Sequence, residues 1–382
     1  PPMLAGTLEL TSKVRYGLTS RGVPIFRFIP YDKRFPPYAV GCSQRNLFYN
    51  VHAIVEPTQV QARPRKGELP RANLVKNLGP PTKESEAEVL LVTYAHDSQK
   101  VTYPTLSGNT VSLIKARDTP PGKTFHIDPP GCKDVDDTFS VHFNTKSRSW
   151  EIAINIADVA EHVREGSALD ASARQRATSF YSPTGQDLFS MLPSDLANKV
   201  ASLLPGQEKL TVSLCFEFDY ATAEMSEPHF KLTTTTTHSS YTYDEAQENL
   251  DSDAPMVEFL VLQRVAETLA PGPPQQRPDT HQIVERLMVF YNSQAGKLLA
   301  EHRVGIHRRH KGPAVHIRGI PGVKGIPEFL AYEAASYCLP GEGGHFGLGT
   351  DFYAYASSPI RRYADIVNQR AIKAILQGIT IN

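Results

Sequence analysis

Short apolar or alternating runs, separated by glycine and proline, characterise the first third of the chain. The runs fall at residues 7–11, 25–29, 39–42 and 88–93. Runs of this length, rich in β-branched and aromatic residues and bounded by turn residues, are typical of strands. The pattern therefore predicts four short strands within residues 1–118. A region built in this way is expected to form a small β-barrel of the OB or cold-shock type.

The hydrophobic pattern becomes mixed from residue 119 onward. Ile152, Ile154 and Ile156 alternate with small or polar residues, which predicts a strand. Ser167 is a suitable N-cap for a helix at 168–177, because its hydroxyl can accept a hydrogen bond from the first turn. Apolar residues recur at helical spacing in four further segments, 243–250, 257–268, 282–302 and 366–376. This mixture predicts an α+β domain over residues 119–382.

Residues 57–83 form a proline-rich segment with many basic and few acidic side chains. The basic residues are Arg63, Arg65, Lys66, Arg71, Lys76 and Lys83. One interpretation is a solvated connection. The other is a loop that contacts phosphate groups, since Lys and Arg neutralise a nucleic-acid backbone. The sequence leaves both interpretations open.

Composition limits the classes of function without selecting one. Lys plus Arg and Asp plus Glu number 40 each among 382 residues, so a nucleic acid would have to bind at local basic patches. No apolar run reaches the roughly 18 residues that a membrane-spanning helix needs, so we expect no membrane partner. The four cysteines lie far apart, which favours a reducing compartment, the cytoplasm. An organelle stays open, because the sequence begins Pro1-Pro2-Met3 and an address segment can precede it.

Four aspartates within ten residues form the most informative motif. With the spacing D-x5-D-x-D-D, they are Asp128, Asp134, Asp136 and Asp137. Residues 129–131 read Pro-Pro-Gly, which predicts a tight turn that folds the first aspartate towards the others. Like charges this close repel unless a cation lies among them, and Mg²⁺ prefers oxygen ligands. Two such ions stabilise the attacking and leaving oxygens of a phosphodiester. An acidic, solvated loop is the alternative.

The segment 126–137 resembles the catalytic signature of the RNase II/RNase R (RNB) family of 3′→5′ exoribonucleases. The similarity does not depend on one motif, because further matching segments follow in the family's order. They are 156–159, 166–170, 180–183, 191–193, 241–247, 288–292, 345–349 and 358–365. The resemblance implies an RNB-type catalytic domain at 119–382 and, more loosely, an RNA-binding barrel at 1–118.

The resemblance also implies a role for each aspartate. Asp128, Asp134 and Asp137 would ligate or orient Mg²⁺, as a pair of ions, with Mn²⁺ as an alternative metal. Asp136 would be the carboxylate most critical for the chemistry, while also facing the metal. We therefore name Asp136 and Asp134 as catalytic candidates and all four aspartates as metal candidates.

Three residues outside this motif are implied to contact RNA. Tyr181 matches the tyrosine that stacks near the 3′-terminal nucleotide. Arg361, the third catalytic candidate, matches the arginine at the scissile phosphate, where a planar guanidinium suits charge that grows in the transition state. Arg362 has two interpretations, an RNA contact or an ion pair with Asp365 at i and i+3.

A second basic patch at 302–324 contains no acidic residue. It is interpreted as a wall of an RNA channel, with Arg308 and Arg309 as RNA-binding residues, or as a solvated face. Its four histidines match no zinc signature. Glu285 is expected to bind RNA. Arg286 replaces the second acid of the family's motif, so the binding of a ribose hydroxyl at this position is in question.

The sequence leads to one principal function and two alternatives. We expect a Mg²⁺-dependent hydrolytic exoribonuclease that degrades or trims single-stranded RNA to 5′-monophosphates. The first alternative is a weak or inactive RNB-fold scaffold or RNA-binding subunit, with protein partners in a larger assembly. The second is a metal phosphodiesterase for structured RNA or DNA. Only residues 363–382 follow Arg362, so no S1 barrel of the family's kind is evident: either the sequence is a piece or the protein lacks that barrel.

Overall fold

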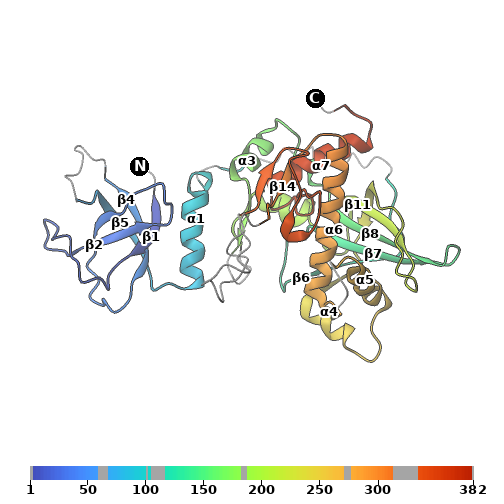
Figure 1. The fold of residues 1–382 in the computed structure, drawn as a ribbon, viewed down its shortest axis with the longest axis horizontal. Helices are drawn as coiled ribbons and strands as arrows, with labels where there is room; N and C mark the ends of the chain where they lie inside the picture. The colour runs from blue at the N-terminus through green and yellow to red at the C-terminus, as the bar shows by residue number, and fades with distance from the viewer. Residues whose placement is uncertain are drawn as a thin grey trace, which may run out of the picture. The chain divides into compact units, whose positions relative to one another are not determined.

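The chain folds into two compact units (Figure 1). The computed structural model describes residues 3–58, 68–99, 102–104, 117–181, 187–270, 277–312 and 334–380. The first unit comprises Pro1–Thr102 and Ser179–Ser190, and the second comprises Tyr103–Thr178 and Met191–Asn382. Each unit has a hydrophobic core of its own.

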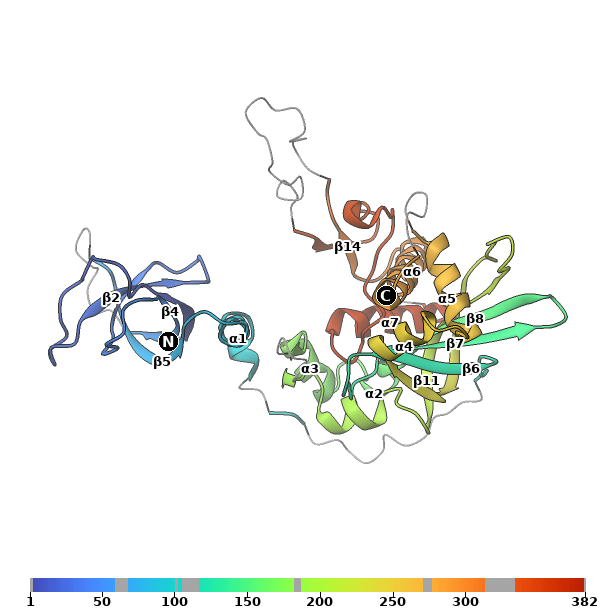
Figure 2. The ribbon, with the colours of Figure 1, turned by 90° about the horizontal axis from the view of Figure 1, so that it is seen from below.

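A closed five-stranded barrel forms the first unit's centre (Figure 2). The strand order is β1-β2-β3-β5-β4, with β3 and β5 parallel and the other pairs antiparallel. The strands are β1 (Leu4–Leu8), β2 (Ile25–Pro30), β3 (Tyr38–Gly41), β4 (Val51–Pro57) and β5 (Arg71–Gly79). Phe26, Phe28 and Val55 are buried in the barrel interior. This topology confirms the OB-like barrel that the short strands predicted.

The strand predicted at 88–93 is wrong, because these residues lie within helix α1, Lys83–Gln99. Thr82 precedes the helix, and its hydroxyl accepts a hydrogen bond from an amide of the first turn at 3.2 Å. Val89 is fully buried and packs against Ile54 of the barrel. The apolar run is therefore one face of a helix that packs on the barrel.

Residues 71–79 of the basic segment at 57–83 form the barrel strand β5 rather than a connection. β5 places Ala72 in the barrel core. Lys76, on the same strand, forms a 2.5 Å ion pair with Glu88 of α1. The part at 59–67 lies outside the described residues, so its contact with phosphate stays a prediction.

A six-stranded sheet forms the centre of the second unit. Its order is β12-β11-β8-β7-β6-β13, and only β13 and β6 are parallel neighbours. The strands are β6 (Lys123–Asp128), β7 (Asp137–Asn144), β8 (Ser149–Ala157), β11 (Glu208–Phe218), β12 (His229–Thr236) and β13 (Ser239–Thr242). The predicted alternating strand is β8, and Ile152, Ile154 and Ile156 are all buried in one core.

Four helices share that core with the sheet (Figure 1). They are α4 (Tyr243–Leu250), α5 (Val257–Thr268), α6 (Thr280–Glu301) and α7 (Tyr363–Leu376). Phe259 of α5, Leu287 of α6 and Ile372 of α7 are buried in it. All four predicted helices are confirmed, although α6 begins at Thr280 instead of 282 and α7 at Tyr363 instead of 366.

The remaining elements are short. They are α2 (Val159–His162), α3 (Ala168–Arg176), the π-helix η1 (Leu196–Val200), β14 (His307–Arg309), β15 (Ser336–Cys338), the 3₁₀-helix η3 (Phe346–Leu348) and, in the first unit, β9 (Phe180–Tyr181) and β10 (Asp187–Phe189). The cap predicted for α3 is present, since Ser167 Oγ accepts a hydrogen bond from the Asp170 amide at 3.1 Å. Among the residues described above, no helix combines the length and the apolar character that crossing a bilayer requires.

Candidate active site

The four aspartates lie where strands β6 and β7 are joined. β6 ends at Asp128 and β7 begins at Asp137, and because the strands are antiparallel neighbours both residues lie at one end of the pair. Residues 129–131 form the predicted turn, in which Gly131 adopts a φ of +78°, a region that favours glycine. The turn reverses the direction of the chain and brings Asp128 close to Asp137. The charge of Asp128 therefore raises the pKa of Asp137.

Asp136 is the most buried of the four carboxylates, with 4% exposure. Its Oδ1 accepts a hydrogen bond from the Ile360 amide at 2.8 Å, and its Oδ2 lies 3.3 Å from Nε of Arg361. Burial raises the pKa of Asp136 to about 7, although Arg361 and the hydrogen bond oppose this rise. Burial and the charges of Asp128 and Asp136 raise the pKa of Asp137 as well. Negative charge in this cluster is therefore incompletely compensated.

The carboxylates of the cluster are chemically suited to a divalent cation, but the side chains are not arranged as a complete set of metal ligands. Carboxylate oxygens are the ligands that Mg²⁺ prefers, and four carboxylates lie within ten residues around one turn. Within the described residues, no three His, Cys, Asp or Glu side chains lie close enough together to hold a metal ion.

His126 contacts Asp128 directly. Its Nδ1 lies 2.7 Å from Oδ2 of the aspartate, two positions further along β6. Alternate residues of a strand face the same side, which brings the two side chains together. The ring is 4% exposed, and its Nε2 is buried without a hydrogen-bond partner. Sequence reasoning missed this histidine, although it opens the 126–137 motif.

The adjacent arginines Arg361 and Arg362 have different environments. The Arg361 side chain is 50% exposed, and its Nη2 donates to Ser358 Oγ at 3.0 Å. Arg362 donates two hydrogen bonds to Asp365, at 2.9 and 2.7 Å, which confirms the expected i,i+3 pair. Arg361 thus presents its guanidinium both to Asp136 and to solvent, whereas Arg362 is bound into the fold.

Tyr243 is a neighbour of the aspartates that sequence reasoning also missed. Burial raises its pKa, and the charges of Asp137 and Asp128 raise it further. Its ring stacks on His281, with the ring centroids 4.0 Å apart and the planes 9° apart. Tyr243 lies inside the 241–247 motif, which was the available signal, whereas His281 lies in none of the segments that matched the family.

The departure at Arg286 has a structural account. Its Nη1 donates to the Ala266 carbonyl at 3.1 Å. Ala266 lies in the last turn of α5, where carbonyls have no partner within the helix. Arg286 therefore joins α6 to the end of α5. Glu285, the predicted RNA contact, is exposed on α6.

The other predicted RNA contacts are distributed over both units. Tyr181 lies in β9 of the first unit and pairs with Asp187 of β10. Arg308 and Arg309 lie in β14 and are partly buried. The rest of the basic patch, from 313 to 324, lies outside the described residues.

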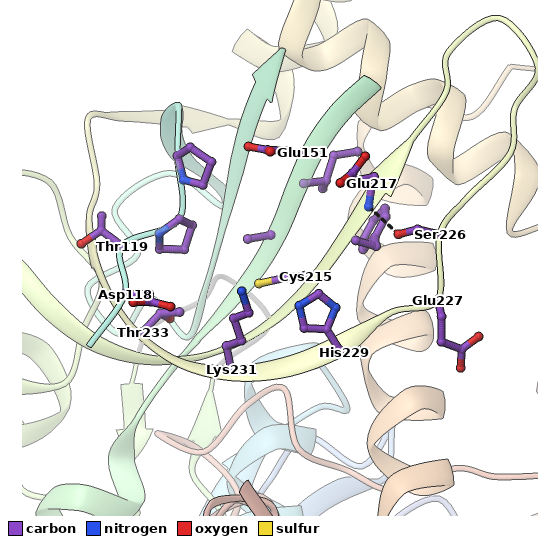
Figure 3. A pocket seen from close by; sticks show the side chains of 15 residues that line it. Asp118, Thr119, Glu151, Cys215, Glu217, Ser226, Glu227, His229, Lys231 and Thr233 are labelled. Atoms are coloured by element: carbon purple, nitrogen blue, oxygen red, sulfur yellow. Dashed lines mark hydrogen bonds between the residues drawn. The ribbon is translucent and has the colours of Figure 1, made fainter. Parts of the chain in front are cut away.

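A pocket of about 480 Å³ lies on strands β8, β11 and β12, away from the aspartates (Figure 3). Lys231 and His229 extend over it beside Cys215. Its acidic lining residues are Asp118, Glu151, Glu217 and Glu227. Mixed charge of this kind does not match a polyanion, so the carboxylate cluster remains the candidate active site.

Known proteins are similar in sequence to the part of the chain that contains the four aspartates. The RNB domain family model matches residues 116–269 and 330–378. The chain is 26% identical over 427 residues to the exosome complex exonuclease RRP44 of Mus musculus, covering 90% of this chain and 44% of that protein. It is 26% identical over 324 residues to exoribonuclease 2 of Aeromonas hydrophila, covering 67% of this chain and 48% of that protein. The chain thus spans about half the length of these relatives.

Solved structures share the fold. The structure of yeast Ssd1, described as a pseudonuclease, has a TM-score of 0.74 and 19% identity, and the match covers 100% of this chain and 56% of that one. The apo form of Mycoplasma genitalium RNase R has a TM-score of 0.66 and 17% identity, with 99% of this chain and 70% of that one covered. Because the family model matches more than half of the residues, with its motifs at the cluster, this chain belongs to the RNB domain family, the family of RNase II and RNase R.

Proposed function

We propose that this chain hydrolyses single-stranded RNA from its 3′ end and releases 5′-monophosphates. The observation that most supports this is the carboxylate of Asp136. It is buried and held between the Ile360 amide and the Arg361 guanidinium. Asp137 lies close enough to Asp128 and Asp136 for their charges to raise its pKa. Carboxylates grouped in this way beside one arginine suit metal-assisted phosphodiester chemistry.

Each residue has a separate task in this proposal. Two Mg²⁺ ions, or Mn²⁺ in their place, would be held by Asp128, Asp134, Asp136 and Asp137. When bound, the metal supplies a nucleophilic water and neutralises charge on the phosphate. His126 keeps the carboxylate of Asp128 in a fixed orientation.

Arg361 would contact the scissile phosphate. Half of its side chain is exposed, and the hydrogen bond to Ser358 holds the guanidinium beside Asp136. A guanidinium fixed in this way stabilises negative charge that grows in the transition state. Tyr181 would stack on the terminal base, and Arg308, Arg309 and Glu285 would contact the strand.

An RNA cleavage assay tests the proposal. RNA labelled at its 5′ end is incubated with the protein and Mg²⁺, with EDTA, and with the Asp136→Asn variant. We expect a Mg²⁺-dependent ladder that shortens from the 3′ end and is absent from the other two reactions. DNA of the same sequence separates an exoribonuclease from a general phosphodiesterase. Equal cleavage by the variant would contradict the role of Asp136.

A second candidate is an RNB-fold subunit that binds RNA or protein without turnover. One observation favours it: the fold is shared with yeast Ssd1, which is described as a pseudonuclease. A relative is named as an exosome complex exonuclease, so a protein assembly is a reasonable partner. This candidate predicts intact RNA in every cleavage reaction, with RNA binding retained.

A further inference from the structure

Guanidinium groups and aromatic rings alternate on the surface next to Arg361. The Cζ atom of Arg362 lies 4.0 Å from the ring centroid of Tyr355. The Cζ atom of Arg308 lies 5.0 Å from that centroid and 4.7 Å from the centroid of Tyr337. We call these four residues, Arg362, Tyr355, Arg308 and Tyr337, the cation–ring stack. Its order runs from the residue that follows Arg361 outward to Tyr337.

The inner end of the cation–ring stack is fixed by the fold. Arg362 is bound to Asp365, which is fully buried and accepts a further hydrogen bond from the Ser358 amide at 2.8 Å. The Arg308 amide donates to the Tyr353 carbonyl at 2.8 Å. Strand β14 is therefore joined to the segment that leads to Arg361, and the stack is held in place before any ligand binds.

The outer end of the stack is open. Tyr337 is 55% exposed. It lies on β15 directly opposite Arg308 of β14, so Arg308 supports it from the neighbouring strand. This end therefore offers an exposed ring surface that is backed by a guanidinium group.

These features match a single-stranded polyanion that has flat bases. An exposed aromatic ring stacks on a base of any identity, and nearby guanidinium groups attract the backbone. The described residues 302–312 contain four Arg or Lys side chains and no acid, which suits a phosphate chain. A cationic ligand is disfavoured, because Arg308 already lies against the same ring.

We propose that Tyr337 is a base-stacking site for single-stranded RNA, supported by Arg308 and leading through Tyr355 to Arg361. The inference rests on the proposed function, since it assigns an approach for that function's substrate. In this proposal, the base that stacks on Tyr337 lies on the 5′ side of the scissile phosphate. Tyr337 belongs to the same unit as the aspartates. This stacking contact is distinct from the contact expected for Tyr181.

RNA binding by variants of Tyr337 tests the inference. The full chain is used with Asp136→Asn, so that RNA stays intact, and affinity is measured by fluorescence anisotropy. We expect Tyr337→Ala to weaken binding of a long oligouridylate by about tenfold, as loss of one stacked base does. Tyr337→Phe keeps the ring and should bind normally. Tyr337→Leu keeps apolar volume without a ring and should resemble the alanine variant. Tyr220→Ala, which removes another exposed tyrosine, is the matched control.

Kinetics separate this inference from the proposed function. With Asp136 intact, Tyr337→Ala should raise KM about tenfold and leave kcat unchanged, because stacking contributes uniform binding. Normal RNA affinity of Tyr337→Ala would overturn the stacking site and would leave the proposed exonuclease activity standing. Weakened affinity in a chain that never cleaves RNA would instead support the site and refute the exonuclease.

Discussion

The Nε atom of Arg361 lies 3.3 Å from Oδ2 of Asp136. The amide of the preceding residue, Ile360, donates to Oδ1 of the same carboxylate. Two consecutive residues before α7 therefore contact both oxygens of a buried aspartate at the start of β7. This arrangement keeps one positive charge beside the carboxylate cluster. Half of the Arg361 side chain is exposed, so we propose that the same guanidinium also contacts the phosphate of the substrate.

Replacing Arg361 should reduce catalysis without unfolding the protein. We expect Arg361→Ala to lower kcat for RNA cleavage by about 100-fold or more, as loss of one transition-state donor does. Arg361→Lys keeps the charge but lacks the planar fork, so an intermediate rate is expected. Single-turnover cleavage measures both. Arg174→Ala removes an exposed arginine of α3 and serves as control. A wild-type rate for Arg361→Ala would exclude the phosphate role.

The raised pKa of Asp136 predicts how stability depends on pH in metal-free protein. The folded-state pKa is about 7 and the ordinary value is 3.8, so between them the folded state holds a proton that the unfolded state releases. This stabilising contribution is fully present below 3.8 and is lost as the pH rises through 7. From about pH 6 to 8 we expect a loss of about 1 kcal/mol in the free energy of unfolding.

Thermal unfolding in EDTA measures this loss, and Asp136→Asn removes it. The difference between the two proteins is the informative quantity, because burial lowers the pKa of His162 and gives an opposite pH dependence. Mg²⁺ competes with the bound protons, so it should raise the Tm more at pH 8 than at pH 6. If the difference in Tm between the wild type and Asp136→Asn did not change with pH, the raised pKa of Asp136 would be contradicted.

The contact between His126 and Asp128 predicts a selective effect on metal affinity. Only Nδ1 contacts the aspartate, and an asparagine amide can occupy that position, whereas a glutamine amide reaches towards Nε2. We expect His126→Gln to weaken Mg²⁺ binding by about 10- to 100-fold, as loss of a partner of a ligand does. His126→Asn should remain near wild type. Calorimetric titration with Mn²⁺ compares them without relying on turnover, and equal affinities would remove the orienting role.

Local sequence predicted the parts of the site that are local in the chain. The turn at 129–131 and the pair between Arg362 and Asp365 depend on neighbouring residues, and both are present. The local pattern at 88–93 predicts a strand where α1 forms, because one apolar helix face that packs on a barrel resembles a short strand run. Its acidic first turn was the signal that local reasoning could have used.

Contacts between distant segments could not be read from local patterns. The Ile360 amide and the Asp136 carboxylate are 224 positions apart, and only the packing of α7 against the sheet brings them together. The stacking of Tyr243 on His281 likewise depends on how α4 meets α6. Family resemblance supplied the role proposed for Arg361, whereas the hydrogen bond that the neighbouring Ile360 amide donates to Asp136 is seen only in the structure.

A buried ion pair joins Lys373 of α7 to Asp158, the residue that follows β8. Lys373 Nζ lies 2.7 Å from both carboxylate oxygens of Asp158, which is 2% exposed. Arg117 and Glu161 complete the group, which is neutral as a whole. Lys373→Met leaves an excess negative charge buried there. We expect it to lower the free energy of unfolding by about 3–5 kcal/mol, the usual cost of breaking a buried pair on one side.

Urea unfolding followed through Trp150 measures this change, because the chain has one tryptophan and it lies in β8 of the central sheet. The double variant Asp158→Asn/Lys373→Met leaves only Arg117 and Glu161 charged, so neutrality returns. It should therefore be more stable than Lys373→Met alone, even though it has lost more polar contacts. If the double variant were the less stable of the two, hydrogen bonding rather than charge balance would account for the stability of this group.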